Sequence, residues 1–323
     1  MSASGVYKGP LTNREEYVDL AVNLPIMHTG YYPLRNSRIH YRHWGTGPRL
    51  VFAFHGYGES AAAFSFLGEA IGDDFTLIAI DLPFHGQTEW NDGLFFDPRD
   101  LLFVLQGIEA ALAATREVPA DPLSPRDPLP DTPVPPPAPY LPGWWFLGYS
   151  MGGRIALQLL QDNPQLADKL VLLAPDGLKL NPWYWMATQT RPGNIVFRAT
   201  MRRPGWFFLL LRLGHALQWV NPSVYKFTVQ YIHDDGVRQE LYTRWTTMRG
   251  FRPRLAAIAA IIRERQLPVR LVYGSYDRII RWESAEKFRK RGIAATCHLT
   301  LLPTGHQLLR PQYLSVLLSE LTA

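Results

Sequence analysis

The feature that most constrains the fold of this chain is a succession of short apolar runs, several of them separated by segments with helical periodicity. Strand-like runs occupy residues 37–44, 49–55, 75–81, 144–150, 169–175, 269–274 and 297–303. Several of these runs are continuous rather than alternating in apolar residues, as expected of strands covered on both faces. Strands of this kind that alternate with helices predict an α/β fold with a mostly parallel sheet flanked by helices.

Helices are predicted between some of these strands and near the end of the chain. The segment 97–114 places Asp97 at the N-cap and Pro98 at the first helical position, and continues with apolar residues at helical spacing. Further helices are expected over 151–163, 284–291 and 312–321. The start of the helix after Asp97 is the best specified of these boundaries.

Two segments interrupt the alternation and set the expected domain organisation. Residues 118–143 hold eleven prolines and little apolar periodicity, so we expect a proline-rich surface loop, which we favour over a ligand for a polyproline-binding partner. Residues 178–250 are rich in Trp, Tyr, Phe and Arg and are expected to form a helical cap. The core would then comprise residues 1–177 and 251–323.

Composition excludes several classes of protein. Of the 323 residues, 47% are hydrophobic, which is enough for a large buried core. The single cysteine, Cys297, excludes an intramolecular disulfide framework and a cysteine-based metal cluster, and is expected to be buried in a strand. The first residues lack a basic start followed by an apolar run, so we expect no secretory signal and a cytoplasmic protein.

Charge and hydropathy also limit the partners. The longest apolar run, 206–213, is far shorter than the roughly 20 residues needed to cross a bilayer. The formal net charge is +5, and basic residues gather between Arg191 and Arg212. We interpret them first as solubility charge, second as a site for an anionic substrate and last as a nucleic-acid site, so no nucleic-acid partner is expected.

Ser150 in the stretch GYSMGG has the setting of a nucleophile. An apolar strand ends at it and a helix begins after it, and Gly148, Gly152 and Gly153 supply the small residues that such a tight turn requires. The first amides of the helix would face a developing oxyanion and lower its energy. We therefore predict a catalytic serine.

A serine hydroxyl needs a base that is itself oriented by an acid. His306 follows the strand-like run 297–303 and Asp277 follows the run 269–274, and the loops after parallel strands converge at one edge of the sheet. We predict His306 as the base and Asp277 as the acid, with Asp176 as the alternative acid.

Other candidate side chains are interpreted as structural. His40, His43 and His298 lie within strand patterns, and Asp81 is expected to cap a turn.

The second part of an oxyanion hole is expected in the stretch HGYGES, after the strand-like run 49–55. Gly56 allows the backbone to turn an amide toward the site. We predict the amides of Tyr57 and Met151 as the two donors, and we expect His55 and Gly56 to contact substrate.

These motifs, taken together, resemble the α/β-hydrolase fold family. The stretches HGYG, DLPFHG, GYSMGG, YGSYDRII and PTGHQLL occur in the family's order and at fitting distances along nearly the whole chain. The resemblance implies an eight-stranded, mostly parallel sheet, a cap inserted after the sixth strand, and a triad of Ser150, Asp277 and His306. The same three residues follow from the strand ends alone.

The predicted activity is hydrolysis of a carboxylic ester or a related acyl substrate through an acyl-enzyme, with no metal and no organic cofactor. Arg154 beside an arginine-bearing cap also resembles lyases of menaquinone synthesis, in which arginines hold carboxylates, and carbon–carbon bond hydrolases share the motif. Arg154 is interpreted equally as a structural side chain. Acyl transfer and a non-catalytic binding module are the further alternatives.

The cap is expected to select the substrate, a small acyl compound. Trp183 and Trp206 would line an apolar pocket together with neighbouring aromatic residues. The stretch GWFFLLLRL could instead rest on a membrane surface, a role that we rank below the pocket.

Overall fold

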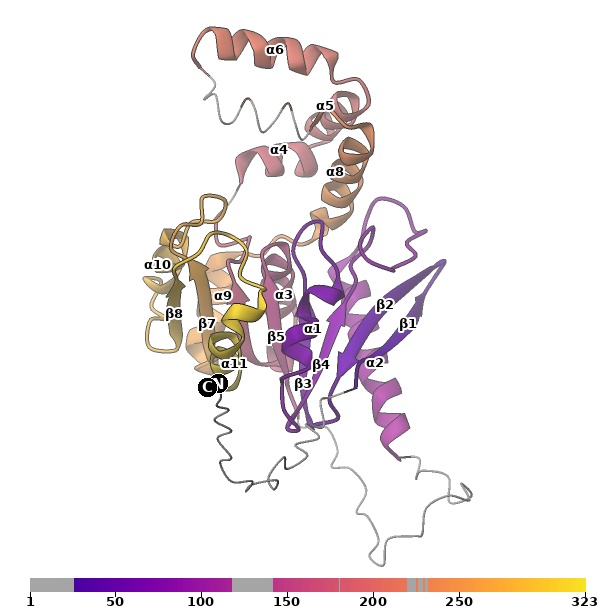
Figure 1. Ribbon diagram of the computed structural model, residues 1–323, viewed down its shortest axis with the longest axis vertical. Coiled ribbons are helices and arrows are strands. Elements are labelled where there is room, and N and C mark those ends of the chain that lie inside the picture. The colour runs from indigo at the N-terminus through magenta and orange to yellow at the C-terminus, as the bar shows by residue number, and fades with distance from the viewer. Residues whose placement is uncertain (1–25, 118–141, 180, 220–224, 226–228, 230–231) are drawn as a thin grey trace, which may run out of the picture.

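The computed structural model describes residues 26–117, 142–179, 181–219, 225, 229 and 232–323. At its centre lies an eight-stranded sheet with the strand order β1-β2-β4-β3-β5-β6-β7-β8 (Figure 1). The strands are β1 (His28–Leu34), β2 (Ser37–Trp44), β3 (Arg49–Phe54), β4 (Phe75–Ile80), β5 (Trp144–Tyr149), β6 (Ala167–Leu173), β7 (Val269–Gly274) and β8 (Cys297–Leu302). β1 and β2 run antiparallel to their neighbours and β3 to β8 are mutually parallel. The predicted α/β class is confirmed.

Helices cover both faces of this sheet. On one face α2 (Pro98–Glu117), α3 (Met151–Asp162) and α9 (Leu255–Arg265) pack side by side, and on the other α1 (Ser65–Gly68) contacts α11 (Leu314–Thr322). α10 (Glu283–Arg289) lies beside β8. The predicted helix start after Asp97 is observed, because the Arg99 amide donates to Asp97 Oδ1 at 2.9 Å.

The core sits between the central strands and these helices. Every residue from Leu50 to Phe54 is shielded from solvent, and Phe146 on the neighbouring β5 packs against Phe54. Burial on both faces explains why these strands read as continuous apolar runs rather than as alternating ones. Because the strands themselves are buried on both faces, polar side chains can gather beyond their carboxyl ends.

Strand β1 was not predicted from the residues. It lies at the edge of the sheet, most of its residues are exposed, and it contains Gly30 and Pro33. An edge strand needs no apolar pattern and tolerates proline, so β1 lacks the signal that identified the other strands.

Four described helices follow β6 and lie beyond the carboxyl ends of the parallel strands (Figure 1). They are α4 (Pro182–Gln189), α5 (Arg191–Arg202), α6 (Gly205–Ala216) and α8 (Asp235–Thr247). α8 attaches this region to the core, since the Arg244 Nε donates to the Phe84 carbonyl at 2.9 Å and the Phe96 amide donates to the Thr247 carbonyl at 2.9 Å. The division into a core and a cap over 178–250 stays a prediction.

The proline-rich segment lies largely outside the described residues, which resume at residue 142. No helix in the part of the chain that the structure describes is long and apolar enough to cross a membrane.

Candidate active site

Ser150 occupies the sharp turn between β5 and α3. Its φ of 51° is positive, a conformation that is uncommon for a residue with a side chain and is held here by the surrounding backbone. The Ser150 amide donates to the Leu173 carbonyl at 2.9 Å, and the Ser150 carbonyl accepts from the Asp176 amide at 2.8 Å. The turn is therefore fixed against the end of β6.

The glycines around Ser150 are required by close approach of the backbone. A Cβ at Gly148 would lie 2.6 Å from the Gly152 carbonyl oxygen, and one at Gly152 would collide with the Phe54 carbonyl oxygen at the end of β3. A Cβ at Gly153 would collide with Pro175. These glycines let α3 begin directly above the strands, which brings its first turn to the Ser150 side chain.

Three side chains from three loops meet at this turn. His306 Nε2 lies 3.0 Å from Ser150 Oγ, and His306 Nδ1 lies 2.7 Å from Asp277 Oδ2. Both distances are those of hydrogen bonds. The Asp277 side chain is fully buried and that of His306 is 14% exposed. The structure thus brings together the three residues that the sequence predicts as a triad.

The Asp277 carboxylate is held in one orientation. Its Oδ1 accepts hydrogen bonds from the amides of Ile279 at 2.8 Å and Ile280 at 3.0 Å, which leaves Oδ2 for His306. Because Oδ2 can only accept, it favours the tautomer of His306 that carries hydrogen on Nδ1. The Nε2 lone pair then faces the Ser150 hydroxyl.

Tyr149 contacts His306 through its hydroxyl and its ring. Its hydroxyl donates to the His306 carbonyl at 3.1 Å, and the two rings lie with centroids 5.5 Å apart. Burial raises the pKa of Tyr149, so the phenol keeps its proton and remains a donor.

Asp176, the alternative acid, is engaged elsewhere. It forms an ion pair with Arg154, whose guanidinium lies 4.0 Å from the centre of the Tyr184 ring on α4. Arg154 is buried by these contacts. In this geometry Arg154 joins α3 to the helices beyond the sheet, and its predicted substrate contact stays a prediction.

The loop after β3 lies against Ser150. A Cβ at Gly56 would lie 3.3 Å from the Ser150 Cβ, which places the Gly56 backbone beside the nucleophile candidate. Met151 is the first residue of α3 and is buried. Tyr57 follows Gly56 in this loop, so the two amides predicted for the oxyanion hole stand on the two segments that flank Ser150.

His55 does not line the site as expected, because it is wholly buried with both ring nitrogens bonded. Nδ1 donates to the Gly56 carbonyl at 2.8 Å, and Nε2 accepts from the Leu82 amide at 3.1 Å. Burial lowers the pKa of His55 to about 4, so the ring is neutral at pH 7. His55 therefore holds the loop in place, and its side chain cannot reach a substrate.

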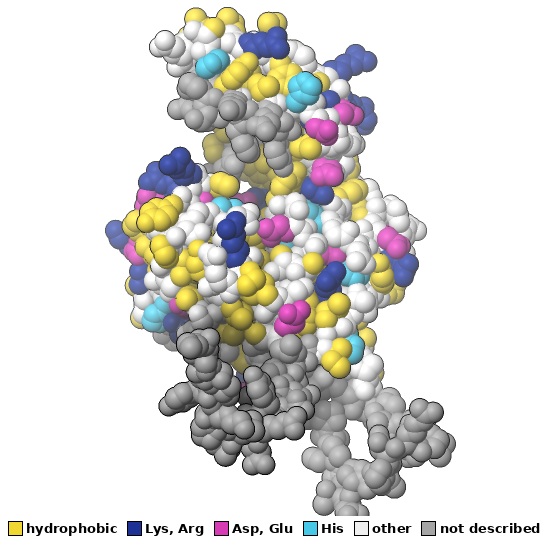
Figure 2. All heavy atoms as spheres, in the orientation of Figure 1, with side chains coloured by type: hydrophobic (Ala, Val, Ile, Leu, Met, Phe, Trp, Pro, Cys, Tyr) yellow, Lys and Arg dark blue, Asp and Glu magenta, His cyan; other side chains and the backbone are white. Residues whose placement is uncertain are grey.

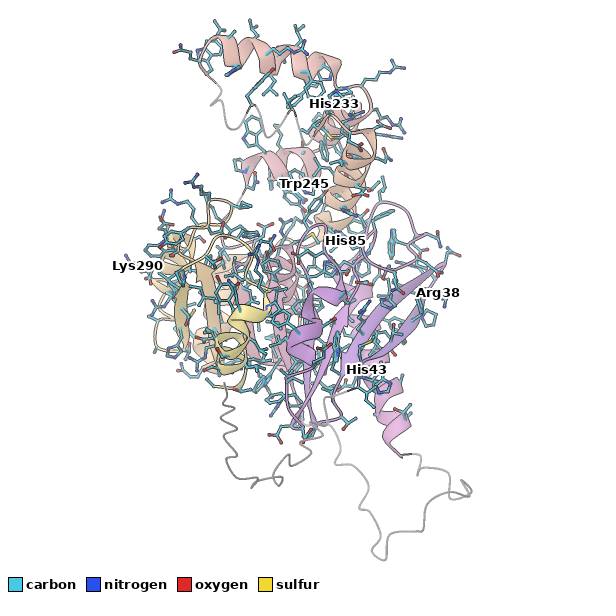
Figure 3. The ribbon with its side chains drawn as sticks, viewed as in Figure 1. Arg38, His43, His85, His233, Trp245 and Lys290 are labelled. Atoms are coloured by element: carbon cyan, nitrogen blue, oxygen red, sulfur yellow. The ribbon has the colours of Figure 1, made fainter. Side chains whose placement is uncertain are left out.

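His85, which was not among the predicted site residues, is also buried and lies below the helices beyond the sheet (Figure 3). Its ring centroid is 5.0 Å from that of His55 and 6.1 Å from that of Tyr57. Arg244 of α8 reaches the same place and lies 5.4 Å from the Tyr57 ring centre. His85 lies in the motif DLPFHG, but nothing in a single sequence distinguishes its burial from the exposure of a loop histidine.

The histidines and the aspartate interpreted as structural take no part in the hydrogen bonds of Ser150, His306 and Asp277. His40 Nδ1 lies 2.7 Å from Asp81 Oδ2, with both side chains buried in the sheet. Asp81 also accepts from the amides of Ala61 at 2.6 Å and Gln87 at 2.8 Å, as a turn-capping residue does. His43 lies on β2 and His298 on β8.

The aromatic residues predicted to line a pocket are largely open to solvent. Trp183 is 73% exposed and Trp206 is 45% exposed. Tyr184, on α4, is buried against Arg154 and Trp245 instead. The expected pocket wall of Trp183 and Trp206 is not formed in this structure.

Comparisons with known proteins agree with this fold. A family model described as serine aminopeptidase, S33, matches residues 137–311, which is more than half of the chain. The uncharacterized hydrolase YugF of Bacillus subtilis is 22% identical over 287 residues, covering 87% of this chain and 92% of that protein.

Solved structures share the fold at low sequence identity. A thermophilic esterase from Thermogutta terrifontis is 17% identical with a TM-score of 0.56, over 88% of this chain and 93% of that chain. A hydrolase from Pseudomonas aeruginosa is 20% identical with a TM-score of 0.55, over 94% of this chain and 100% of that chain. The match of the family model over more than half of the chain shows that it belongs to the serine aminopeptidase S33 family of α/β hydrolases and is a hydrolase, and the solved structures share its fold.

Proposed function

We propose that this hydrolase cleaves carboxylic esters or related acyl compounds through a covalent acyl-enzyme on Ser150. The observation that carries the proposal is the continuous hydrogen-bond chain from Ser150 Oγ through the His306 ring to Asp277. An arrangement of nucleophile, base and orienting acid in hydrogen-bond contact is what acyl transfer by a serine requires.

In the proposed reaction, His306 Nε2 takes the proton of Ser150 Oγ as that oxygen attacks the acyl carbon. Asp277 stabilises the resulting imidazolium through the Nδ1 hydrogen bond, and its own orientation is set by the Ile279 and Ile280 amides. His306 then gives the proton to the leaving alcohol. A water molecule, activated by the same nitrogen, releases the acid and restores Ser150.

The oxyanion of each tetrahedral intermediate would be bound by the amides of Tyr57 and Met151. The Met151 amide stands at the N-terminus of α3, where the helix dipole favours negative charge. The loop of Tyr57 is held by His55 through the Gly56 carbonyl. This rigid support would spare the reaction the cost of reorienting donors as charge develops.

The contacts of Arg154 favour an ester substrate over the lyase alternative. A lyase of the kind considered needs an arginine to hold a substrate carboxylate, whereas Arg154 is buried and paired with Asp176. Acyl transfer to an alcohol or thiol would use the same triad, and so would carbon–carbon bond hydrolysis.

The proposal is tested with a panel of p-nitrophenyl esters of increasing acyl length. We expect turnover by the wild type and a loss of about 10⁴-fold or more in kcat/KM for Ser150→Ala and for His306→Ala. Ser319→Ala on α11 and His298→Ala on β8, both exposed, are matched controls that should keep full activity. A wild-type enzyme inert to every ester, or a Ser150→Ala variant as active as the wild type, would contradict the proposal.

A further inference from the structure

Helix α6 carries an apolar face whose side chains are largely open to solvent. Trp206, Leu209, Leu210, Leu213 and Leu217 recur at spacings of three and four residues, so they share one side of the helix. They are between 45% and 67% exposed. Trp219, just after the helix, is 81% exposed.

The opposite side of α6 faces the protein. Phe207, Phe208 and Leu211 are only partly exposed, and the centroids of the Phe207 and Phe208 rings lie 6.1 Å apart. The helix is therefore seated on one side and presents a second apolar side outward. Exposed apolar side chains gathered on one side of a helix mark an interaction surface.

This surface lies at one end of the molecule. Figure 1 shows α6 as the element farthest from the sheet, beyond α4 and α5. Figure 2 shows hydrophobic side chains together with Lys or Arg side chains at this same end. Of the described helices and strands, none lies beyond α6 at this end.

The charged residues of the stretch that contains α5 and α6 are all of one sign. Residues 191–219 contain no Asp or Glu. The arginines of this stretch are exposed on α5, on the connection to α6, and on α6 itself; they are Arg191, Arg198, Arg202, Arg203 and Arg212. An arginine stem can lie along an apolar boundary while its guanidinium reaches phosphate.

We propose that α6 and its flanking arginines, which we call the basic apolar tip, dock this protein onto the surface of an anionic lipid bilayer. An exposed leucine and tryptophan face beside arginines is the pattern of a helix that lies in the membrane interface, with its apolar side among acyl chains and its cations at headgroup phosphates. At 12 residues the helix is too short to span a bilayer.

The charge of the tip favours a lipid surface over a second copy of the chain. A symmetric dimer through α6 would set Arg202, Arg203 and Arg212 of one copy near the same residues of the other, with no acidic residue of the stretch to compensate. Anionic headgroups complement both the apolar face and the arginines. Docking would turn the end of the molecule that bears Ser150 toward the bilayer, and the surface is assigned independently of the ester chemistry.

The test is co-sedimentation of the full-length protein with vesicles of phosphatidylcholine alone and of phosphatidylcholine mixed with phosphatidylglycerol. We expect binding to the mixed vesicles, weakened by high salt because ions screen the arginines. Leu209→Gln with Leu213→Gln should reduce the partition coefficient about tenfold or more, since two leucines no longer enter the interface. Arg202→Glu with Arg203→Glu should abolish the preference for phosphatidylglycerol.

The matched control is Phe103→Gln with Leu301→Gln, which removes exposed apolar side chains from α2 and β8. It should bind as the wild type does, and circular dichroism should show that all variants are folded. No binding of the wild type, or equal binding by the Leu209 and Leu213 variant, would overturn the proposal. The proposal would also be overturned if light scattering showed a wild-type dimer that the Leu209 and Leu213 substitutions dissociate, while the wild type did not bind vesicles.

Discussion

An Asp277→Asn variant changes what the His306 ring can do while keeping the shape of the site. In the structure Asp277 Oδ1 accepts from the two amides of Ile279 and Ile280, so the asparagine oxygen will take that position. Its NH₂ group then faces His306 Nδ1 and must donate to it. The ring is forced into the tautomer with hydrogen on Nε2, which cannot accept the proton of Ser150.

The size of this effect follows from the loss of the base. An inverted tautomer of this kind lowers kcat by about 10⁴-fold in serine proteases. That factor corresponds to about 5 kcal/mol of transition-state stabilisation. We expect a loss of this order for Asp277→Asn in the p-nitrophenyl ester assay, with KM changed far less because the residue is buried beneath His306.

Asp176→Asn is the matched control, because it makes the same chemical change at the other candidate acid. It weakens the ion pair with Arg154, so we expect stability to fall by about 1–3 kcal/mol with kcat changed less than tenfold. A larger loss of kcat from Asp176→Asn than from Asp277→Asn would refute the assignment.

Three further predictions concern the scaffold. Gly152→Ala should lower the melting temperature sharply or prevent folding, because its Cβ would collide with the Phe54 carbonyl, whereas Gly205→Ala, whose Cβ would meet no heavy atom within 4 Å, should melt as the wild type does. The pKa of His55 is lowered by burial from 6.5 to about 4, so the unfolded chain binds more protons between these values and stability should fall as pH drops from about 6.5 to 4. His55 alone would contribute roughly 3 kcal/mol to that fall, and urea unfolding at pH 7 and pH 4.5 should show a smaller difference in a His55→Gln variant. Burial raises the pKa of the Cys297 thiol to about 12, so a thiol reagent should label this residue only after denaturant is added, and rapid labelling of the native protein would contradict its burial.

Most of the sheet and the three-residue constellation could be predicted because both depend on local patterns. Strand β7, Val269–Gly274, has the bounds that its apolar run predicts, and Asp277 and His306 follow strand ends that a parallel sheet must bring together. β1 could not be found in this way, because an edge strand whose residues are mostly exposed carries no hydrophobic pattern.

The parts of the site that sequence reasoning could not assign depend on which partner a side chain meets. A single sequence leaves Arg154 free to bind a substrate, whereas its pairing with Asp176 appears only when α3 and the end of β6 are packed together. His55 is similar, since its Nε2 accepts from the Leu82 amide, a partner that lies in a different loop. Trp206 was predicted to line a pocket but is exposed, because an aromatic residue in a predicted cap can face solvent as readily as a pocket.

The central claim, that Ser150 is the nucleophile of an acyl-enzyme, is tested most directly by intact-mass measurement after treatment with a fluorophosphonate. We predict one adduct per chain, mapped by peptide sequencing to Ser150, absent in Ser150→Ala and greatly slowed in His306→Ala. An unmodified wild-type protein, or an adduct on a different residue, would contradict the account.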